Sequence, residues 1–263
     1  YQQKYPSIIK LILQDVNQFS ININLPFKHS LAIAQGEYVA LCEGDDFWVD
    51  RCKLQRQILE LKKHSDLNLC VHNAYIINSE EEPHSSYQFP TRKEATHIID
   101  YAEIYKVHSQ FCPTASMFIR KSVLDNLPSF FYDAPIGDFF LEAFSGINGI
   151  VYLHEKMSVY RRESQNSWSS ETVNNTVKLK KHNLRMIESL DKLERYLEPE
   201  YSRNVKIRKQ YIFGQLCTQS VLQNKYLESV KYFNKYRAQG AAFKSLLSLL
   251  YRCSKTLFMR RAF

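Results

Sequence analysis

The order of hydrophobic and polar positions divides the first part of the chain into short strands and helices. Short runs rich in apolar and β-branched residues predict strands over residues 7–13, 37–42, 67–78, 114–120, 150–153 and 156–162. Helices are predicted over residues 27–34, 51–63, 121–127 and 138–145. Asp50 is expected to cap the helix 51–63, and Leu54, Ile58 and Leu61 share one face of it. Strands that alternate with helices predict an α/β layer fold.

After residue 171 the spacing of apolar residues becomes helical over long stretches. The first such stretch runs from Met186 to Leu197 and is ended by Pro199. Further helices are predicted over residues 205–223, 226–238 and 241–259, and the last of these has one apolar and one basic face. The chain is therefore expected to hold an α/β domain over residues 1–170 and a helical region over residues 171–263.

The charge of the chain differs between these two parts. The 263 residues carry a formal charge of +8, with −4 on residues 1–170 and +12 on residues 171–263. A mildly acidic part followed by a basic tail is compatible with a solvated surface, an anionic membrane face or nucleic acid. The aromatic residues of the tail fall at the spacing of a helical core, so no nucleic-acid partner is predicted.

The cysteines and the apolar runs favour a cytoplasmic chain. The 6 cysteines are scattered without a C-x-x-C pair, which is typical of a reducing compartment. No apolar run reaches the length of a membrane span, and no signal peptide is visible. The sequence begins at Tyr1 rather than at Met, so an upstream segment stays open as an alternative.

Three carboxylates gather where the predicted strand 37–42 ends. Glu43, Asp45 and Asp46 follow that strand directly, and Trp48 comes shortly after them. Ligands of open α/β sheets bind beyond the carboxyl ends of strands, and adjacent carboxylates repel one another unless a cation lies between them. We therefore expect Asp46 to bind a divalent metal, Asp45 to contact the ribose or assist the metal, and Glu43 to be a weaker candidate for either role. The alternatives are that the aspartates only shape a turn and that Trp48 belongs to the core rather than to the wall of a site.

The stretch Gly36–Gln57, with Glu43-Gly-Asp-Asp-Phe-Trp48 and Lys53-Leu-Gln-Arg-Gln57, resembles the metal-binding segment of family 2 glycosyltransferases with the GT-A fold. The likeness is greatest to bacterial enzymes that build surface polysaccharides. Three later segments fit the family in the same order and extend the resemblance over about residues 5–170. They are Thr114–Arg120, similar to the strand that lines the sugar pocket, Pro135–Phe140, similar to the helix start that carries the catalytic base, and Met157–Arg162, similar to the closing Tyr-Arg segment.

The resemblance implies a GT-A type, Rossmann-like mixed sheet flanked by helices, followed by an α-helical C-terminal region. It also implies transfer of a sugar, with inversion, from a nucleotide-diphosphate sugar such as a UDP-sugar to a hydroxyl of a cell-surface glycan or lipid-linked acceptor. The implied cofactor is Mg²⁺ or Mn²⁺. By the same resemblance Asp138 is the catalytic base, Arg161 and Arg162 neutralise the diphosphate, and Thr114 lies at the donor.

Single positions within this pattern carry alternatives. Relatives commonly place a His two residues after the Tyr-Arg arginine, and Glu163 stands there in this chain, where it can also bind a hard cation. The alternative for Asp138 is a plain helix N-cap, with Asp133 and Glu142 as reserve candidates for the base. Since strand neighbours face opposite ways, one of Arg161 and Arg162 is expected to point to solvent.

The function as a whole has two alternatives. The first strands of the family, which hold the nucleotide base, have no clear counterpart, so the domain is expected to be N-terminally truncated and could serve as a non-catalytic, membrane-associated binding module. A polymerase would need a further upstream aspartate, and residues 1–30 offer only Asp15. For the terminal helix, residues 241–263, the two interpretations are peripheral contact with the inner face of the cell membrane and packing on the preceding helices.

Overall fold

A mixed sheet of six strands forms the centre of the first part of the chain. The computed structural model describes residues 1–78, 80–83, 89, 94–107, 110–162, 175–242, 245 and 248–253. The strands are β1 Tyr38–Ala40, β2 Phe47–Trp48, β3 Leu69–Ile77, β4 His97–Ile99, β5 Phe118–Arg120 and β6 Ile150–Arg161. Their order is β1-β5-β3-β6-β2, and β4 pairs with β6 as well. The long strands β3 and β6 run parallel, and every other pair is antiparallel.

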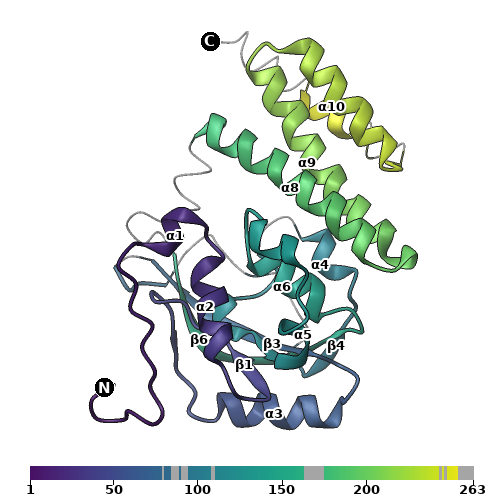
Figure 1. The fold of residues 1–263 in the computed structure, drawn as a ribbon. Helices are drawn as coiled ribbons and strands as arrows, with labels where there is room; N and C mark the ends of the chain where they lie inside the picture. Colours follow the sequence, from purple (N-terminus) through teal and green to yellow (C-terminus); the bar gives the residue numbers. More distant parts are fainter. Residues whose placement is uncertain are drawn as a thin grey trace.

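Helices cover both faces of this sheet (Figure 1). Those of the first part are α1 Gln18–Ile21, α2 Leu25–Ile33, α3 Lys53–Lys63, α4 Glu103–Lys106, α5 Lys121–Leu124 and α6 Asp138–Ser145. Figure 1 shows α3 on one side of the sheet and α2 and α6 on the other. The helical region follows with α8 Thr176–Tyr196, α9 Ser202–Leu222 and α10 Tyr226–Ala238, stacked beyond α6. The predicted mixed α/β fold with a C-terminal helical region is confirmed at this level.

Successive side chains of the central strands β3 and β6 point alternately into two separate hydrophobic cores. On β3, Leu69 and Val71 point into the larger core, whereas Cys70 points into the smaller one beneath α3. On β6, Ile150 belongs to the larger core and Val151 to the smaller one. A strand that is buried on both faces has a continuous apolar run in its sequence, and such runs allowed β3 and β6 to be predicted as strands.

The larger core continues without a break into the helical region. Met186 and Leu190 of α8 and Leu216 of α9 belong to the same cluster of buried residues as Phe140 of α6. The helices beyond residue 175 therefore pack on the α/β part through a shared apolar core. No helix within the described ranges is both long and apolar enough to cross a membrane.

The predicted strand over residues 7–13 is wrong. These residues form no strand and pair with none of the strands that the structure describes. The side chains of Ile8, Leu11 and Leu13 are 79%, 59% and 86% exposed. An apolar run becomes a strand only when a neighbouring strand satisfies its backbone groups, and the described residues supply no such neighbour here.

The predicted start of α3 is wrong, whereas two of the three residues of its predicted apolar face, Ile58 and Leu61, pack in the smaller core. The helix begins at Lys53 rather than at residue 51, and the Asp50 carboxylate accepts a hydrogen bond from the Cys52 amide, at 2.6 Å, in the turn before it. Leu54 is 41% exposed, whereas Lys53, Gln57 and Leu61 face the sheet. The buried face is thus partly polar, because two of its members have hydrogen-bonding partners there.

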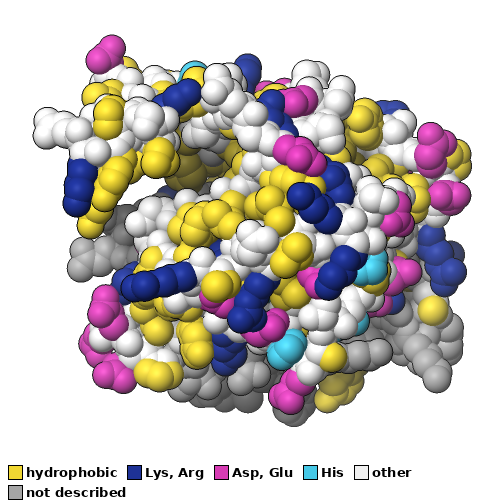
Figure 2. Space-filling model, turned by 90° about the horizontal axis from the view of Figure 1, so that it is seen from below, with side chains coloured by type: hydrophobic (Ala, Val, Ile, Leu, Met, Phe, Trp, Pro, Cys, Tyr) yellow, Lys and Arg dark blue, Asp and Glu magenta, His cyan; other side chains and the backbone are white. Residues whose placement is uncertain are grey.

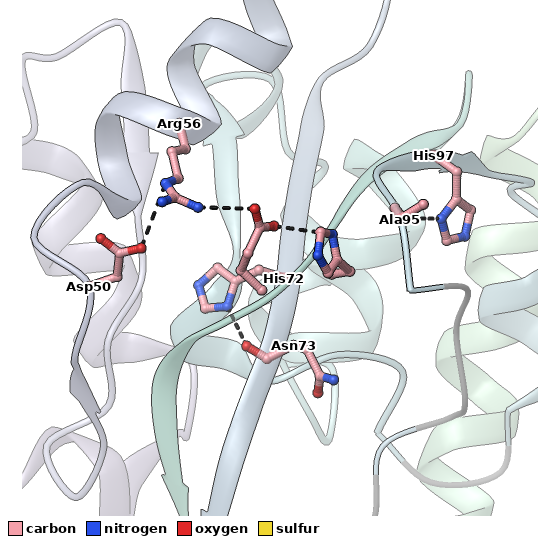
Figure 3. Close-up of polar contacts among 8 residues, drawn as sticks. Asp50, Arg56, His72, Asn73, Ala95 and His97 are labelled. Atoms are coloured by element: carbon pink, nitrogen blue, oxygen red, sulfur yellow. Dashed lines mark hydrogen bonds and ion pairs between the residues drawn. The ribbon is translucent and has the colours of Figure 1, made fainter.

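Ion pairs on the outer side of α3 tie it to the sheet. The Arg56 guanidinium is directed toward Asp50, at 3.7 Å, and donates to the Glu155 carboxylate of β6 at 3.0 Å (Figure 3). Figure 2 views the molecule from below, the side on which α3 lies in Figure 1, and shows acidic, basic and hydrophobic side chains interspersed over that face.

The boundaries of several other strands and helices also differ from the prediction. Residues 114–120 are divided into a 3₁₀ helix, Thr114–Ser116, and the strand β5, so only the second half is extended. The predicted strands 150–153 and 156–162 are one strand, β6, whose pairing register with β3 shifts beside Asn73. Helix α5 ends at Leu124. The predicted helices over residues 138–145 and 226–238 are confirmed to the residue.

Candidate functional site

The acidic turn, which we define as residues 43–46, connects β1 with β2. The Asp46 amide donates to the Glu43 carbonyl at 3.2 Å, which closes the turn. On its far side the Val49 amide donates to the Met157 carbonyl at 3.1 Å and fixes β2 against β6. The apolar strand and the sheet edge therefore set the place of the turn, as the sequence predicted.

Asp46 is the buried carboxylate of this turn. It is 8% exposed, and its Oδ1 accepts from the Arg161 amide at 2.9 Å. Its Oδ2 is buried and has no hydrogen-bond partner among the described residues. Burial raises the pKa of Asp46 to about 6, and the Arg161 amide partly opposes that rise. A buried carboxylate oxygen without a partner is costly unless a ligand completes it.

Arg161, at the end of β6, is bound to the acidic turn. Its Nε donates to the Asp45 carbonyl at 3.2 Å, and its guanidinium pairs with Glu81 at 3.2 Å. The backbone amide of its neighbour Arg162 donates to the Ile77 carbonyl of β3 at 2.8 Å. The Arg161 side chain thus meets the turn and holds its backbone there.

Glu43 connects the acidic turn with the start of α6. Its side chain is exposed overall, and it lies near enough to Asp138 and Asp46 for their charges to act on it. Burial first, and then the negative charge of Asp138, raise the pKa of Glu43 to about 7, while a hydrogen bond from the Thr114 side chain opposes the rise. Thr114 is itself the acceptor of a 3.0 Å hydrogen bond from Gln110. Three of the predicted site residues therefore lie together, although they come from three elements.

Asp138 is the first residue of α6, and Gly137 occupies the N-cap position. The plain N-cap interpretation of Asp138 is therefore wrong. Its Oδ1 accepts from the Phe139 amide at 2.7 Å, and the half-buried side chain has a raised pKa, chiefly because of burial. A raised pKa makes the carboxylate a stronger proton acceptor once it is ionised.

The reserve candidates Asp133 and Glu142 have different surroundings. Asp133 is exposed at the end of a 3₁₀ helix, and its carbonyl accepts from Arg185 at 3.0 Å. Glu142, one turn after Asp138 on α6, is 1% exposed and accepts a hydrogen bond from the Cys112 thiol at 3.3 Å. Burial and the charge of Asp138 raise the pKa of Glu142 well above its ordinary value. Glu142 is therefore less accessible to a substrate than Asp138, which is half-buried.

Arg208 was not among the site residues predicted from the sequence. It lies on α9, is 8% exposed, and its guanidinium is 5.0 Å from the ring centre of Phe139, the residue after Asp138. Its charge lowers the pKa of both Asp138 and Glu142, opposing the effect of their burial. The only signal in the sequence is a basic residue among the apolar positions of a predicted helix.

Trp48 and Lys53 support the acidic turn from below. The indole Nε1 donates to the Ala115 carbonyl at 3.0 Å, so Trp48 joins β2 to the 3₁₀ helix that carries Thr114. The Lys53 ammonium lies 4.2 Å from the centre of the Trp48 ring and donates to Gln57 at 2.8 Å. Trp48 is 38% exposed, so it is not a core residue, and its ring and indole nitrogen are occupied by Lys53 and the Ala115 carbonyl.

The turn fits a divalent cation in one respect. The orphaned Oδ2 of Asp46, next to a second carboxylate in Asp45, offers the hard oxygen ligands that Mg²⁺ and Mn²⁺ prefer. Among the described residues no group of three or more His, Cys, Asp or Glu side chains could hold a metal ion. Mg²⁺ is commonly held by one or two carboxylates together with substrate phosphates, so two carboxylates suffice for that mode. Glu163, the third predicted ligand, lies outside the described residues.

Comparison with known proteins adds relatives without a stated activity. No protein-family model matches the chain. A protein of Mycobacterium bovis and two of Mycobacterium tuberculosis, all three named as uncharacterized, are each 33% identical to it over 172 residues. The match covers 65% of this chain and 46% of each relative. The chain thus spans about half the length of these relatives.

Proposed function

We propose that the chain is a glycosyltransferase of the GT-A type, which moves a sugar from a nucleotide-diphosphate donor to a hydroxyl of a glycan or lipid-linked acceptor. The observation that carries the proposal is that the charges of both Asp46, whose Oδ2 lacks a partner among the described residues, and Asp138 at the start of α6 act on Glu43. A transfer of this kind needs a place for the leaving diphosphate and a base for the attacking hydroxyl within one site. The acidic turn and the start of α6 meet those two needs.

The donor side of the proposed site is the acidic turn. Asp46 and Asp45, with Glu163 as a third ligand, would hold Mg²⁺ or Mn²⁺. When bound, such a cation neutralises the charge that develops on the departing diphosphate. Arg161 fixes the backbone of the turn through the Asp45 carbonyl, and Arg162 is the candidate for contact with the diphosphate. Thr114, Glu43 and Asp45 complete the donor-binding set, for which a UDP-sugar is the proposed ligand.

The acceptor side is Asp138. As the acceptor oxygen forms its bond to the anomeric carbon, its proton passes to the Asp138 carboxylate. The bond between that carbon and the diphosphate oxygen breaks, and its electron pair leaves with the diphosphate, which gives inversion in a single displacement. Burial among apolar residues raises the pKa of Asp138 and so strengthens it as a proton acceptor.

We also propose a cytoplasmic chain that meets the inner face of the cell membrane peripherally. Lipid-linked acceptors would be found there, and residues 241–263 are the proposed contact. Leu249 is fully buried against the preceding helices, whereas Leu250 is 51% exposed in the same segment. The described part of the segment therefore offers one face for packing and another for contact.

The test is release of UDP from a panel of UDP-sugars mixed with lipid-linked glycans extracted from bacterial membranes. We expect release that needs both Mn²⁺ and acceptor and that stops when EDTA is added. Binding of UDP with Mn²⁺ but no release from any donor would favour the alternative of a non-catalytic binding module. Release that is unaffected by EDTA would contradict the proposed metal site.

A further inference from the structure

Arg208 enters the α/β part from the helical region as a buried cation. Its guanidinium packs against two rings, 5.0 Å from the centre of Phe139 and 5.9 Å from that of Tyr211. One of its terminal nitrogens donates to the Val107 carbonyl. Its Nε is buried and has no hydrogen-bond partner among the described residues. A guanidinium retains its charge when buried, so this position places a permanent cation inside the protein.

Two carboxyl groups of α6 act on the charge of Arg208. Arg208 packs on Phe139 in the first turn of α6, and Asp138 and Glu142, one turn apart on that helix, are the carboxyl groups whose charges act on it. Each of these two carboxyl groups has a pKa raised by burial as the largest cause. Among the described residues, the other titratable groups facing Arg208 are His182 of α8, whose pKa burial lowers to about 4, and Tyr211 of α9. His182 is therefore neutral at pH 7 and adds no positive charge.

Arg208 is thus the cation that faces Asp138 and Glu142 together from the helical region. Opposite charges favour the ionised form of a carboxyl group, and like charges disfavour it. Without Arg208, only backbone hydrogen bonds would oppose the effect of burial on the pKa of Asp138. A protonated Asp138 could not accept the proton of an attacking hydroxyl.

We propose that Arg208 is a positioning residue for Asp138, and that the helical region completes the site by holding this cation against the start of α6. The proposal rests on the glycosyltransferase function proposed above. It gives the helical region a role in the chemistry that is separate from any contact with a membrane.

The first test separates charge from fit with two variants. Arg208→Gln retains an amide donor but removes the charge, whereas Arg208→Lys retains the charge. We expect the acid limb of the pH profile of kcat/KM for UDP release to move upward by about 1 pH unit or more in Arg208→Gln, because an opposite charge lowers a carboxyl pKa by about 1–3 units. Arg208→Lys should shift it less. Arg203→Gln, on an exposed position of the same helix, is the matched control and should leave the limb in place.

An acid limb that stays at the wild-type pH in Arg208→Gln would overturn the proposal. A limb that moves equally in Arg208→Gln and Arg208→Lys would overturn it too, since fit rather than charge would then be responsible.

The second test needs no transferase activity, so it separates failure of this proposal from failure of the proposed function. The melting temperature of wild type and of Arg208→Gln is measured at pH 5 and pH 8, alone and combined with Asp138→Asn and Glu142→Gln. A carboxyl group with a raised native pKa destabilises the fold increasingly as it ionises. The loss of melting temperature in Arg208→Gln should therefore be larger at pH 8 than at pH 5.

The combined variants locate the charges that Arg208 compensates. Asp138→Asn and Glu142→Gln each remove one of them, so the additional loss at pH 8 should shrink in both backgrounds. An equal loss at both pH values and in every background would contradict the proposal, whether or not the chain releases UDP.

Discussion

The acidic turn and the start of α6 supply the two ends of the candidate site, and different parts of the chain hold them. The turn is closed by its own backbone, through Asp46 and Glu43, and is fixed by one strand end at Arg161. The start of α6 is fixed from the opposite ends of the chain. The Asn24 side chain donates to the Phe131 and Ala134 carbonyls in the segment before α6, and Arg208 packs against the Phe139 ring in the first turn of α6. The turn therefore depends on its own backbone and on one neighbouring strand, whereas the start of α6 depends on two further segments that are distant from it in the chain.

This difference separates binding from chemistry. A local turn at a sheet edge can be read from a short motif and can bind an ion by itself. A carboxylate whose ionisation depends on distant residues can be tuned by them, which is useful for a base. Substitutions at the two ends should accordingly fail in different ways.

The largest effect is expected at the start of α6. Asp138→Asn should lower the rate of UDP release by about 10²–10⁴-fold, the usual contribution of a general base, while the affinity for UDP with Mn²⁺ stays unchanged. Asp133→Asn, on an exposed aspartate of the preceding segment, is the control and should retain the wild-type rate. Full activity in Asp138→Asn would show that another group is the base.

The next effect belongs to the acidic turn. Asp46→Ala should weaken the Mn²⁺-dependent binding of UDP by about 10–100-fold, since it removes one of the two carboxylates of the turn that are proposed to hold the metal. Asp46→Asn should also lose binding but should melt at the same temperature as wild type or higher, because it removes a buried charge with an unsatisfied oxygen. If Asp46→Asn bound UDP and Mn²⁺ as wild type does, the turn would not be the metal site.

A smaller effect tests what supports the turn. Lys53→Ala should lower the free energy of unfolding by about 2 kcal/mol, through the lost packing of a buried stem against Trp48. Lys63→Ala, whose side chain is 65% exposed, should change it by less than about 0.5 kcal/mol. Urea unfolding of both variants measures the difference, and equal values would show that Lys53 contributes no packing.

The pH dependence of stability gives a second measure of Lys53. Burial lowers its pKa to about 8 in the native state, below the 10.5 of a free side chain. The charged form therefore costs stability at pH 7, and that cost disappears as the pH rises from about 8 to about 10.5. Between pH 8 and pH 10, wild type should gain stability relative to Lys53→Met; a constant difference would contradict the lowered pKa.

The smallest effect tests the support of α6. The Asn24 amide donates to the carbonyls of Phe131 and Ala134 at 3.2 and 3.0 Å, and a Cβ on Gly137 would come within 2.7 Å of its Oδ1. Asn24→Ala should lower the free energy of unfolding by about 1–2 kcal/mol, because buried carbonyls lose their donor. Asn126→Ala, whose side chain binds an exposed carbonyl, is the control. A loss no larger than that of the control would show that Asn24 does not hold this segment.

The same difference explains which parts could be predicted from the sequence. The strands β3 and β6, the helix α6 and the acidic turn follow from apolar runs and turn residues that are adjacent in the chain. The strand over residues 7–13 was predicted wrongly because a strand depends on a partner that the run itself cannot reveal.

The partly polar face of α3 and the role of Arg208 could not be predicted for a related reason. Lys53 faces inward because it packs against the Trp48 ring, and Gln57 because it donates to the carbonyls of Cys70 and Ser116. These partners lie on other elements. Arg208 is a basic residue within a helix. Its partners are the Phe139 ring of α6 and the Val107 carbonyl, which precedes the 3₁₀ helix Thr114–Ser116. Side-chain hydrogen bonds between distant elements leave no periodic signal in the sequence.

Calorimetric titration of wild type, Asp46→Ala and Asp138→Asn with UDP in the presence of Mn²⁺ tests the central claim most directly. Division of the site into a binding end and a chemical end predicts that wild type and Asp138→Asn bind with the same affinity, and that Asp46→Ala binds at least about tenfold more weakly. Equal binding by all three proteins, or loss of binding in Asp138→Asn alone, would contradict it.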